Sequence, residues 1–276
     1  MLQSLYKETL MKYKTKLLVD RFTEILSSWP GVECITVNEA AMQDILDPYF
    51  ALVVDVFCSA PIPDADERCR QYGDDVAAFE SSGQNAKDRF LIGEIPVRLE
   101  YKNTVKIDEL VHIADTKNES LWLIKDSGTY AFYRLVNSEI VFSRTNWINE
   151  VRERLSRIGD QFWIEIRNSV QSKMEHFLSD LGAACFQGDK FHYLIASAGF
   201  IKNVCLTLFC INKRFEPSHR AYFKQVLELP VLPKSFAAEF ETFLDNEGIS
   251  PESRFRLARV IAQRIVMLLP NPDEQL

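Results

Sequence analysis

Two acidic residues lie inside segments whose composition is otherwise typical of β-strands. Asp55 interrupts the apolar run at residues 52–57, and Glu100 lies in residues 95–101, where apolar and polar side chains alternate. A carboxylate buried without a partner costs on the order of several kcal/mol. We therefore expect Asp55 to face a metal ion, an arginine or a backbone cap.

Basic residues gather around Glu100. Residues 84–106 contain five basic residues against three acidic ones, and the five are Lys87, Arg89, Arg98, Lys102 and Lys106. This excess could meet phosphate groups, which arginine grips with two parallel hydrogen bonds. It could equally be an ordinary charged surface on which Arg98 and Lys102 pair with Glu100. The sequence leaves both interpretations open.

A second basic cluster occupies residues 190–224. Its six cations are Lys190, Lys202, Lys213, Arg214, Arg220 and Lys224, and its only acidic residue is Glu216. In a cleft between domains, such a cluster could bind a triphosphate or an acidic partner. On an exposed helix face, these side chains would simply be solvated.

Other familiar chemistries have no sequence signal here. No two of the four histidines stand at the spacing of helical metal ligands, which argues against a histidine-based metal site. The six cysteines form no CxxC pair and lie mostly in apolar runs, so we expect buried reduced thiols. No serine lies in a GxSxG elbow.

Length and charge limit the class of protein. A chain of 276 residues favours two domains, and 47% hydrophobic with 26% charged residues is globular composition. The formal charge of −7 gives no general attraction to nucleic acid. The N-terminus lacks the features of a signal peptide, and no apolar run reaches about 18 residues. We expect a cytoplasmic protein without a membrane span.

The first half of the chain mixes helical and strand patterns. Residues 5–28 predict an amphipathic helix that ends at Trp29-Pro30-Gly31. Strands are predicted at 32–37, 50–58, 90–92 and 95–101, with a short closing strand at 139–142. Residues 38–48 suggest a loop or short helix, residues 64–80 are strongly acidic and predict a solvated excursion, and residues 104–137 carry mixed helical signals.

The second half is almost wholly helical in pattern. Helices are predicted at 147–158, 160–181, 190–212, 218–228, 235–246 and 251–268. Ser250 followed by Pro251 is a helix start signal. We expect an α+β class with a mixed sheet and flanking helices at residues 1–144, followed by an all-helical domain at 145–276.

Several segments together resemble a known family. They are similar to uncharacterised bacterial proteins of the nucleotidyltransferase superfamily. The similar segments are Asp47 to Phe57, which includes Asp55, Phe79 to Ser82, Lys87 to Phe90, Pro96 to Tyr101 and, in the helical part, residues 209–230. The resemblance implies a nucleotidyltransferase-like fold. It also implies carboxylates on neighbouring strands that hold divalent ions, such as magnesium, which clamp a nucleoside triphosphate and activate a hydroxyl.

By this resemblance, Asp55 and Glu100 take the catalytic and metal-binding places. The residues predicted to bind ATP or another nucleoside triphosphate come instead from the basic excess around Glu100, and they are Lys87, Arg89, Arg98 and Lys102. The motif is degenerate. The positions that share a strand face with Asp55 are Val53 and Phe57, so the usual second carboxylate is missing. Asn38-Glu39-Ala40-Ala41 stands where the family has a Gly-Ser turn, which weakens the case for phosphate binding.

Two hypotheses follow. The first is an enzyme that uses magnesium to transfer a nucleotidyl group from a nucleoside triphosphate to a hydroxyl acceptor of unknown identity. The second is a catalytically inactive relative that keeps the fold as a nucleotide-binding or regulatory module. Fold-level likeness alone does not establish activity.

Overall fold

The computed structural model describes residues 2–38, 50–83, 86–116, 119–245 and 248–268. The chain divides into two compact units, each made of two segments. The first unit comprises residues 1–116 and 134–158, and the second comprises residues 117–133 and 159–276. The domain boundary predicted near residue 144 falls inside the second segment of the first unit.

The first unit is built on a mixed sheet of six strands in the order β3-β4-β5-β2-β1-β6. The strands are β1 (Val32–Val37), β2 (Leu52–Cys58), β3 (Val76–Ser81), β4 (Lys87–Ile92), β5 (Ile95–Asn103) and β6 (Glu139–Ser143). Strands β2 and β5 are parallel, and every other neighbouring pair is antiparallel. Apolar residues of β1 and β2 are buried almost throughout, as expected for central strands.

One face of the sheet carries the apolar core of this unit. Helices α1 (Leu2–Ser27) and α2 (Ala65–Tyr72) belong to this side, and α1 lies close to β1 and α2. Phe22 of α1 is 1% exposed and packs its ring 5.4 Å from that of Phe90 on β4. Burial of these apolar side chains holds the sheet against its helices.

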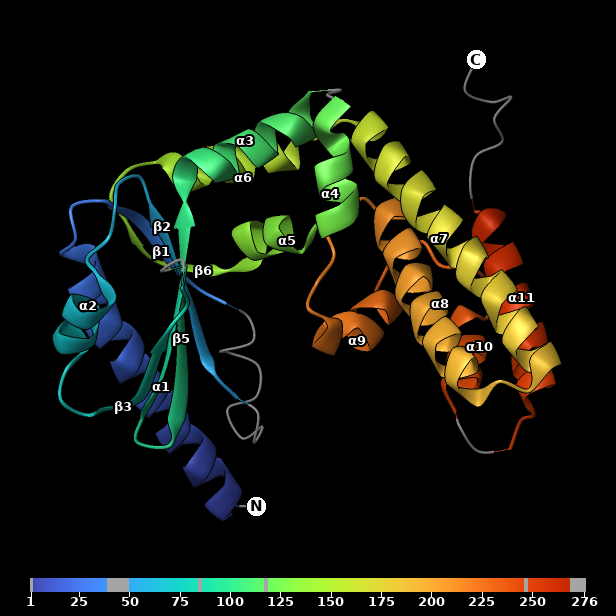
Figure 1. The fold of residues 1–276 in the computed structure, drawn as a ribbon, viewed down its shortest axis with the longest axis horizontal. Helices are drawn as coiled ribbons and strands as arrows, with labels where there is room; N and C mark the ends of the chain where they lie inside the picture. Colours follow the sequence, from blue (N-terminus) through green and yellow to red (C-terminus); the bar gives the residue numbers. More distant parts are fainter. Residues whose placement is uncertain (1, 39–49, 84–85, 117–118, 246–247, 269–276) are drawn as a thin grey trace. The chain divides into compact units, whose positions relative to one another are not determined.

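Three further helices complete the first unit: α3 (Thr104–Asp115), α6 (Trp147–Ser156) and the C-terminal part of α5 (Tyr130–Asn137). Helices α3 and α6 lie side by side (Figure 1). The ring of Trp147 on α6 packs at a tilt against that of Phe57, with 5.3 Å between the ring centroids. The side chain of Phe57 leaves β2 on the same face as Asp55, because the two are two residues apart. This second face therefore has both an apolar and a polar region.

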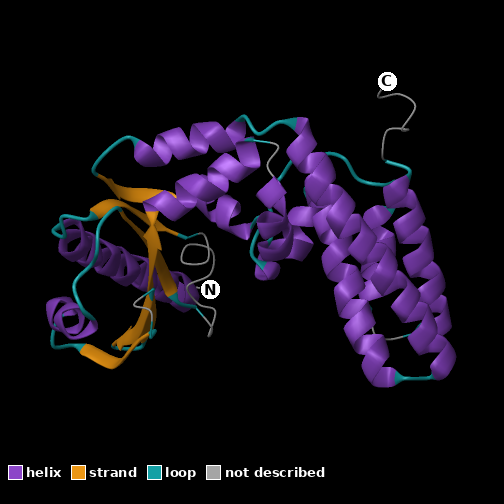
Figure 2. Cartoon of the chain, turned by 45° about the horizontal axis from the view of Figure 1, so that its top comes forward, coloured by secondary structure: helices purple, strands orange, loops and turns teal. Residues whose placement is uncertain are grey.

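The second unit is helical in the described residues, which appear wholly as helix and loop in Figure 2. Its helices are α4 (Trp122–Ser127), α7 (Asp160–Gln187), α8 (Lys190–Ile211), α9 (Tyr222–Leu227), α10 (Phe236–Leu244) and α11 (Pro251–Val266). Helices α7 and α8 form an antiparallel hairpin closed at Gly188, and α11 lies alongside both. Phe200 and Phe243 pack at the centre of this unit.

The α+β class with a mixed sheet, flanking helices and a helical C-terminal half is confirmed. The interpretation of residues 64–80 as a solvated excursion is wrong. This stretch forms α2 and most of β3, and Arg68 and Tyr72 are both fully buried. The acidic residues mark only the solvent side of a short amphipathic helix, capped by Asp64.

Helix α8 is the one helix among the described residues that is long and apolar enough to cross a membrane. Its mean hydropathy reaches 1.9, but 56% of that window is buried within the protein. Phe200, Val204 and Leu208 lie in the apolar core of the second unit, which is the behaviour of a core helix. All six cysteines are free, and burial raises the pKa of Cys205 and of Cys210 to about 12.

Candidate functional site

Asp55 and Glu100 lie opposite each other on adjacent strands. In the parallel pairing of β2 with β5, Asp55 is in register with Glu100. Side chains alternate between faces along a strand, so residues in register leave the sheet on the same face. Asp55 is fully buried, and the side chain of Glu100 is 13% exposed.

The guanidinium of Arg134 joins these two carboxylates. Its Nε donates to Oδ2 of Asp55 at 2.9 Å, and its Nη2 donates to Oδ1 of the same carboxylate. The remaining nitrogen, Nη1, donates to Oε2 of Glu100 at 2.8 Å. Arg134 lies on α5 with only 11% of its side chain exposed, so the contact is well shielded from water. This bidentate pairing is the strongest geometry that an arginine and a carboxylate can adopt.

Further donors surround the two carboxylates. The Nζ of Lys102 lies 3.0 Å from Oδ1 of Asp55, and the Nδ2 of Asn38 donates to Oδ2 of Asp55 at 3.2 Å. Lys87 lies 3.3 Å from Oε1 of Glu100. Every carboxylate oxygen of the pair therefore faces at least one nitrogen. Among the described residues, three cations share two anions, which leaves one positive charge in excess.

The pKa values of Glu100 and Lys102 depend on burial and on the neighbouring charges of the cluster. Burial acts to raise the pKa of the Glu100 carboxyl, but the charges of Arg134, Lys102 and Lys87 together outweigh burial and hold that pKa below its usual range. Burial lowers the pKa of the Lys102 ammonium, and the neighbouring charge of Arg134 lowers it further, against the opposing effect of Asp55. The cations, rather than the carboxylates, carry the surplus charge of the cluster.

This arrangement does not fit a divalent cation. Magnesium prefers an octahedron of oxygen ligands, several of them carboxylates or water. Among the described residues, two carboxylates converge here, and their oxygens are bound by Arg134, Lys102, Lys87 and Asn38. Within the described ranges, no group of three or more His, Cys, Asp or Glu residues could hold a metal ion. Metal binding by Asp55 and Glu100 thus stays a prediction without support from the geometry.

The other predicted binding residues lie on the same face of the sheet. Arg89 on β4 is in register with Arg98 on β5, just as Lys87 is with Glu100. Like charges directly opposite each other are unfavourable. Neither arginine forms an ion pair or a side-chain hydrogen bond with another described residue, although Glu80 is in register with Arg89 across β3 and β4. In the described part of the chain, this face therefore carries two arginines without an ion pair beyond the Asp55 cluster.

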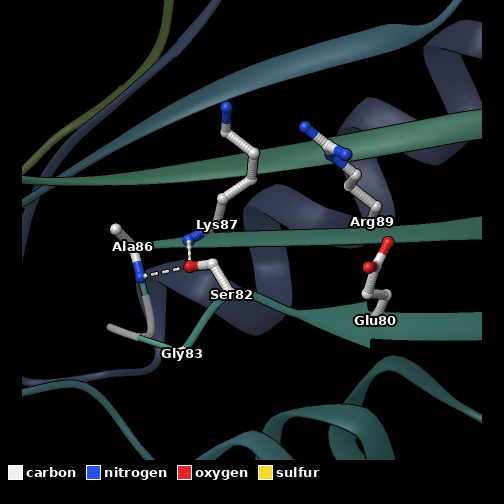
Figure 3. A pocket seen from close by; sticks show the side chains of 6 residues that line it. All are labelled: Glu80, Ser82, Gly83, Ala86, Lys87 and Arg89. Carbon is white, nitrogen blue, oxygen red and sulfur yellow. Dashed lines mark hydrogen bonds between the residues drawn. The ribbon is translucent and has the colours of Figure 1, made fainter.

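A shallow cavity of about 420 Å³ lies beside these cations. It is lined by Glu80, Ser82, Gly83, Ala86, Lys87 and Arg89. Figure 3 shows Lys87 and Arg89 projecting to the same side of β4. The hydroxyl of Ser82 accepts hydrogen bonds from the backbone N–H groups of Ala86 and Lys87, at 3.1 Å each, which orders the base of the loop.

The structure thus places all six predicted residues on one face: Asp55, Glu100, Lys87, Arg89, Arg98 and Lys102. The predicted partners of Glu100 were Arg98 and Lys102, but the ion pairs are made by Arg134 and Lys87. Arg134 was missed. The sequence signal for it was that a buried Asp55 needs a metal ion, an arginine or a backbone cap, and this signal does not identify the partner. Asp47 and residues 39–41, which stand where the family has a Gly-Ser turn, lie outside the described residues.

Comparison with known proteins gives a limited result. No protein-family model matches the chain, and no curated protein matches it. A solved structure of a nucleotidyltransferase-like protein from Exiguobacterium sibiricum is similar, with 11% sequence identity and a TM-score of 0.49. The similarity covers 89% of this chain and 72% of that one. A likeness of this size does not by itself assign an activity.

Proposed function

We propose that this chain is a nucleotidyltransferase-like protein that lacks metal-dependent transfer and uses the basic face of its sheet as a nucleotide-binding or regulatory module. One observation carries the proposal. The guanidinium of Arg134 bridges Asp55 and Glu100, and so takes the place between the two carboxylates where a dication would have to lie. An arginine in place of a dication still neutralises the two carboxylates, but it does not supply the Lewis acid that nucleotidyl transfer needs.

The charge of the face supports a phosphate-bearing ligand. The cluster around Asp55 and Glu100 has one cation in excess, and Arg89 and Arg98 add two more that no described residue neutralises. Two arginines directly opposite each other repel, and a phosphate bound between them would relieve that repulsion. The sequence resemblance to nucleotidyltransferases makes a nucleotide the first ligand to test.

Calorimetric titration with ATP tests this proposal. We expect heat of binding in EDTA that magnesium does not increase, because the protein supplies the cations itself. The double variant Arg89→Gln/Arg98→Gln should weaken binding at least about tenfold, since each charge-assisted contact contributes on the order of 1.5–3 kcal/mol. Arg70→Gln, an exposed residue of α2 in the same unit, is the matched control. Absence of heat, or binding only with magnesium, would refute the proposal.

The second candidate is nucleotidyl transfer with magnesium. It is favoured by the register of Asp55 with Glu100, which brings two carboxylates to one point on the sheet. For this activity the side chain of Arg134 would have to leave both carboxylates. Incorporation of a labelled nucleotide into an acceptor, dependent on magnesium and abolished by Glu100→Gln, would establish this candidate and exclude the first.

A further inference from the structure

A second cavity lies entirely within the helical unit and has a volume of about 290 Å³. Its walls come from the C-terminal end of α4, from one face each of α7 and α8, and from residues 214 and 216. Ile166, Val170 and Phe177 line it from α7, and Leu206 and Phe209 line it from α8. These residues recur at helical spacing, so each helix turns a mostly apolar stripe toward the cavity, interrupted by Lys173 on α7 and by Lys202 and Asn203 on α8.

Two buried polar residues belong to this apolar wall. Asn203 is 4% exposed, and its Nδ2 donates to the backbone oxygen of Gly199 at 2.8 Å. Glu216 is 7% exposed, and its carboxylate accepts a hydrogen bond from the hydroxyl of Tyr222. The other carboxylate oxygen lies against Gly128, only 2.6 Å from where a Cβ would stand. Glu216 is thus held in place by the helical unit itself.

Basic residues predominate among the charged groups of the lining. The cations are Lys125, Lys173, Lys202 and Arg214, against Asp126 and Glu216. Lys125 is neutralised by Glu165 at 2.8 Å. Lys202 and Arg214 are exposed, and neither makes an ion pair or a side-chain hydrogen bond with another described residue. Lys173 donates to the backbone oxygen of Lys125 at 3.4 Å and forms no ion pair with another described residue. Apart from Lys125, the lining thus holds three cations against the two anions Asp126 and Glu216, and it combines this excess of one positive charge with apolar side chains.

We propose that this cavity binds a small organic anion with an apolar body, such as a carboxylate or a phosphate monoester. The apolar stripes of α7 and α8 would cover the body of the ligand, and Lys202 and Arg214 would pair with its anionic group. Apolar walls with a few placed polar groups are the usual composition of small-molecule sites, and this volume suits a small ligand. The site shares no residue with the basic face of the sheet, so it stands whether or not that face binds nucleotides.

Calorimetric titration of the full chain with three related probes tests this site. Phenyl phosphate and phenylacetate carry an apolar ring with an anionic group, and 2-phenylethanol is a neutral molecule of similar size. We expect both anions to bind and the alcohol to bind at least about tenfold more weakly, with anion affinity falling as salt rises. The tighter of the two anions identifies the phosphate or the carboxylate as the natural group.

Variants of the lining residues test whether the anions bind in this cavity. Lys202→Gln/Arg214→Gln should weaken both anions at least about tenfold, because both charge-assisted contacts are removed. Lys190→Gln, an exposed residue at the start of α8 that does not line the cavity, should leave affinity unchanged. Leu206→Trp should fill the cavity and abolish binding, with the circular dichroism melt used to verify folding. Arg89→Gln/Arg98→Gln should have no effect here.

Several results would overturn the site. These are the absence of heat with both anions, equal affinity for the alcohol, wild-type affinity in Lys202→Gln/Arg214→Gln, or retained binding in folded Leu206→Trp. Each would show that the cations and the cavity do not act together on one ligand.

Discussion

The two faces of the sheet each hold an aspartate gripped by an arginine, and they differ in how the charge is balanced. On the core face, Arg68 of α2 donates to Asp88 of β4 through Nε and Nη2, at 2.8 Å each. The hydroxyls of Tyr72 and Tyr101 donate to the same carboxylate at 2.8 and 2.7 Å. Both charged side chains are fully buried, and one cation meets one anion.

On the opposite face, Arg134 grips Asp55 in the same manner but shares the site with Lys102 and Lys87, while Glu100 is the second anion. Neutral hydroxyls complete the Arg68 pair, whereas further cations complete the Asp55 cluster. The Arg68 pair is therefore balanced in charge, whereas the Asp55 cluster keeps one cation in excess among the described residues. Under the proposed function, this excess is what a phosphate-bearing ligand would meet.

Removing Arg68 should produce the largest effect. Arg68→Met leaves Asp88 buried without its cation, and breaking a buried pair in this way costs about 3–5 kcal/mol of unfolding free energy. Urea denaturation measures the loss. Arg70→Met, exposed on the same helix, should change stability by less than about 0.5 kcal/mol. A loss below about 1 kcal/mol for Arg68→Met would contradict the structural role of this pair.

Removing Arg134 should cost less. Asp55 keeps Lys102 and Asn38 as partners in Arg134→Met, so we expect a loss of about 1.5–3 kcal/mol by the same denaturation assay. Adding Asp55→Asn to that variant should recover part of the loss, since the remaining carboxylate charge is gone. If Arg134→Met were as damaging as Arg68→Met, the surplus of cations around Asp55 would not be real.

The change in unfolding free energy at acidic pH should differ between a variant of Glu100 and a variant of an exposed carboxylate. The pKa of Glu100 is lower in the folded protein than in the unfolded chain, so its contribution is present above the unfolded value of about 4.3 and is lost as pH falls through the folded pKa. Glu100→Gln should therefore be less stable than wild type by about 1 kcal/mol at pH 7, and the gap should close with falling pH. Urea titrations across this pH range give the measurement.

The control for that series is Glu94→Gln, which changes an exposed carboxylate in the turn between β4 and β5. Its stability relative to wild type should not vary with pH to the same extent. A gap for Glu100→Gln that widened as pH fell would reverse the sign and disprove the role given to the cations.

The smallest effect is expected at a third pair of the same kind. Arg21 grips Asp75 with two nitrogens, but the side chains are 32% and 54% exposed. Arg21→Met should cost no more than about 1 kcal/mol, because water and salt screen an exposed pair. The difference from wild type should shrink in 1 M salt. A larger cost would mean that burial does not set the order of the three pairs.

Local pattern was enough to predict most of the elements. The alternation in residues 95–101 and the apolar run around Asp55 gave β5 and β2, and Ser250-Pro251 marked the start of α11. Strand periodicity also placed Lys102 and Arg98 on the face of Glu100. The acidic residues within 64–80 led to a wrong prediction of a solvated excursion, because Arg68 and Tyr72 are single buried positions among many exposed ones.

The sequence by itself determined the class of fold and the presence of a buried aspartate that needed a metal ion, an arginine or a backbone cap. Only the tertiary structure decided that the partner is Arg134, which lies 79 residues further along the chain, and that Lys87 rather than Arg98 pairs with Glu100. The physical reason is that side-chain periodicity is a local property of the backbone, whereas ion pairs form between residues that strand register and helix packing bring together.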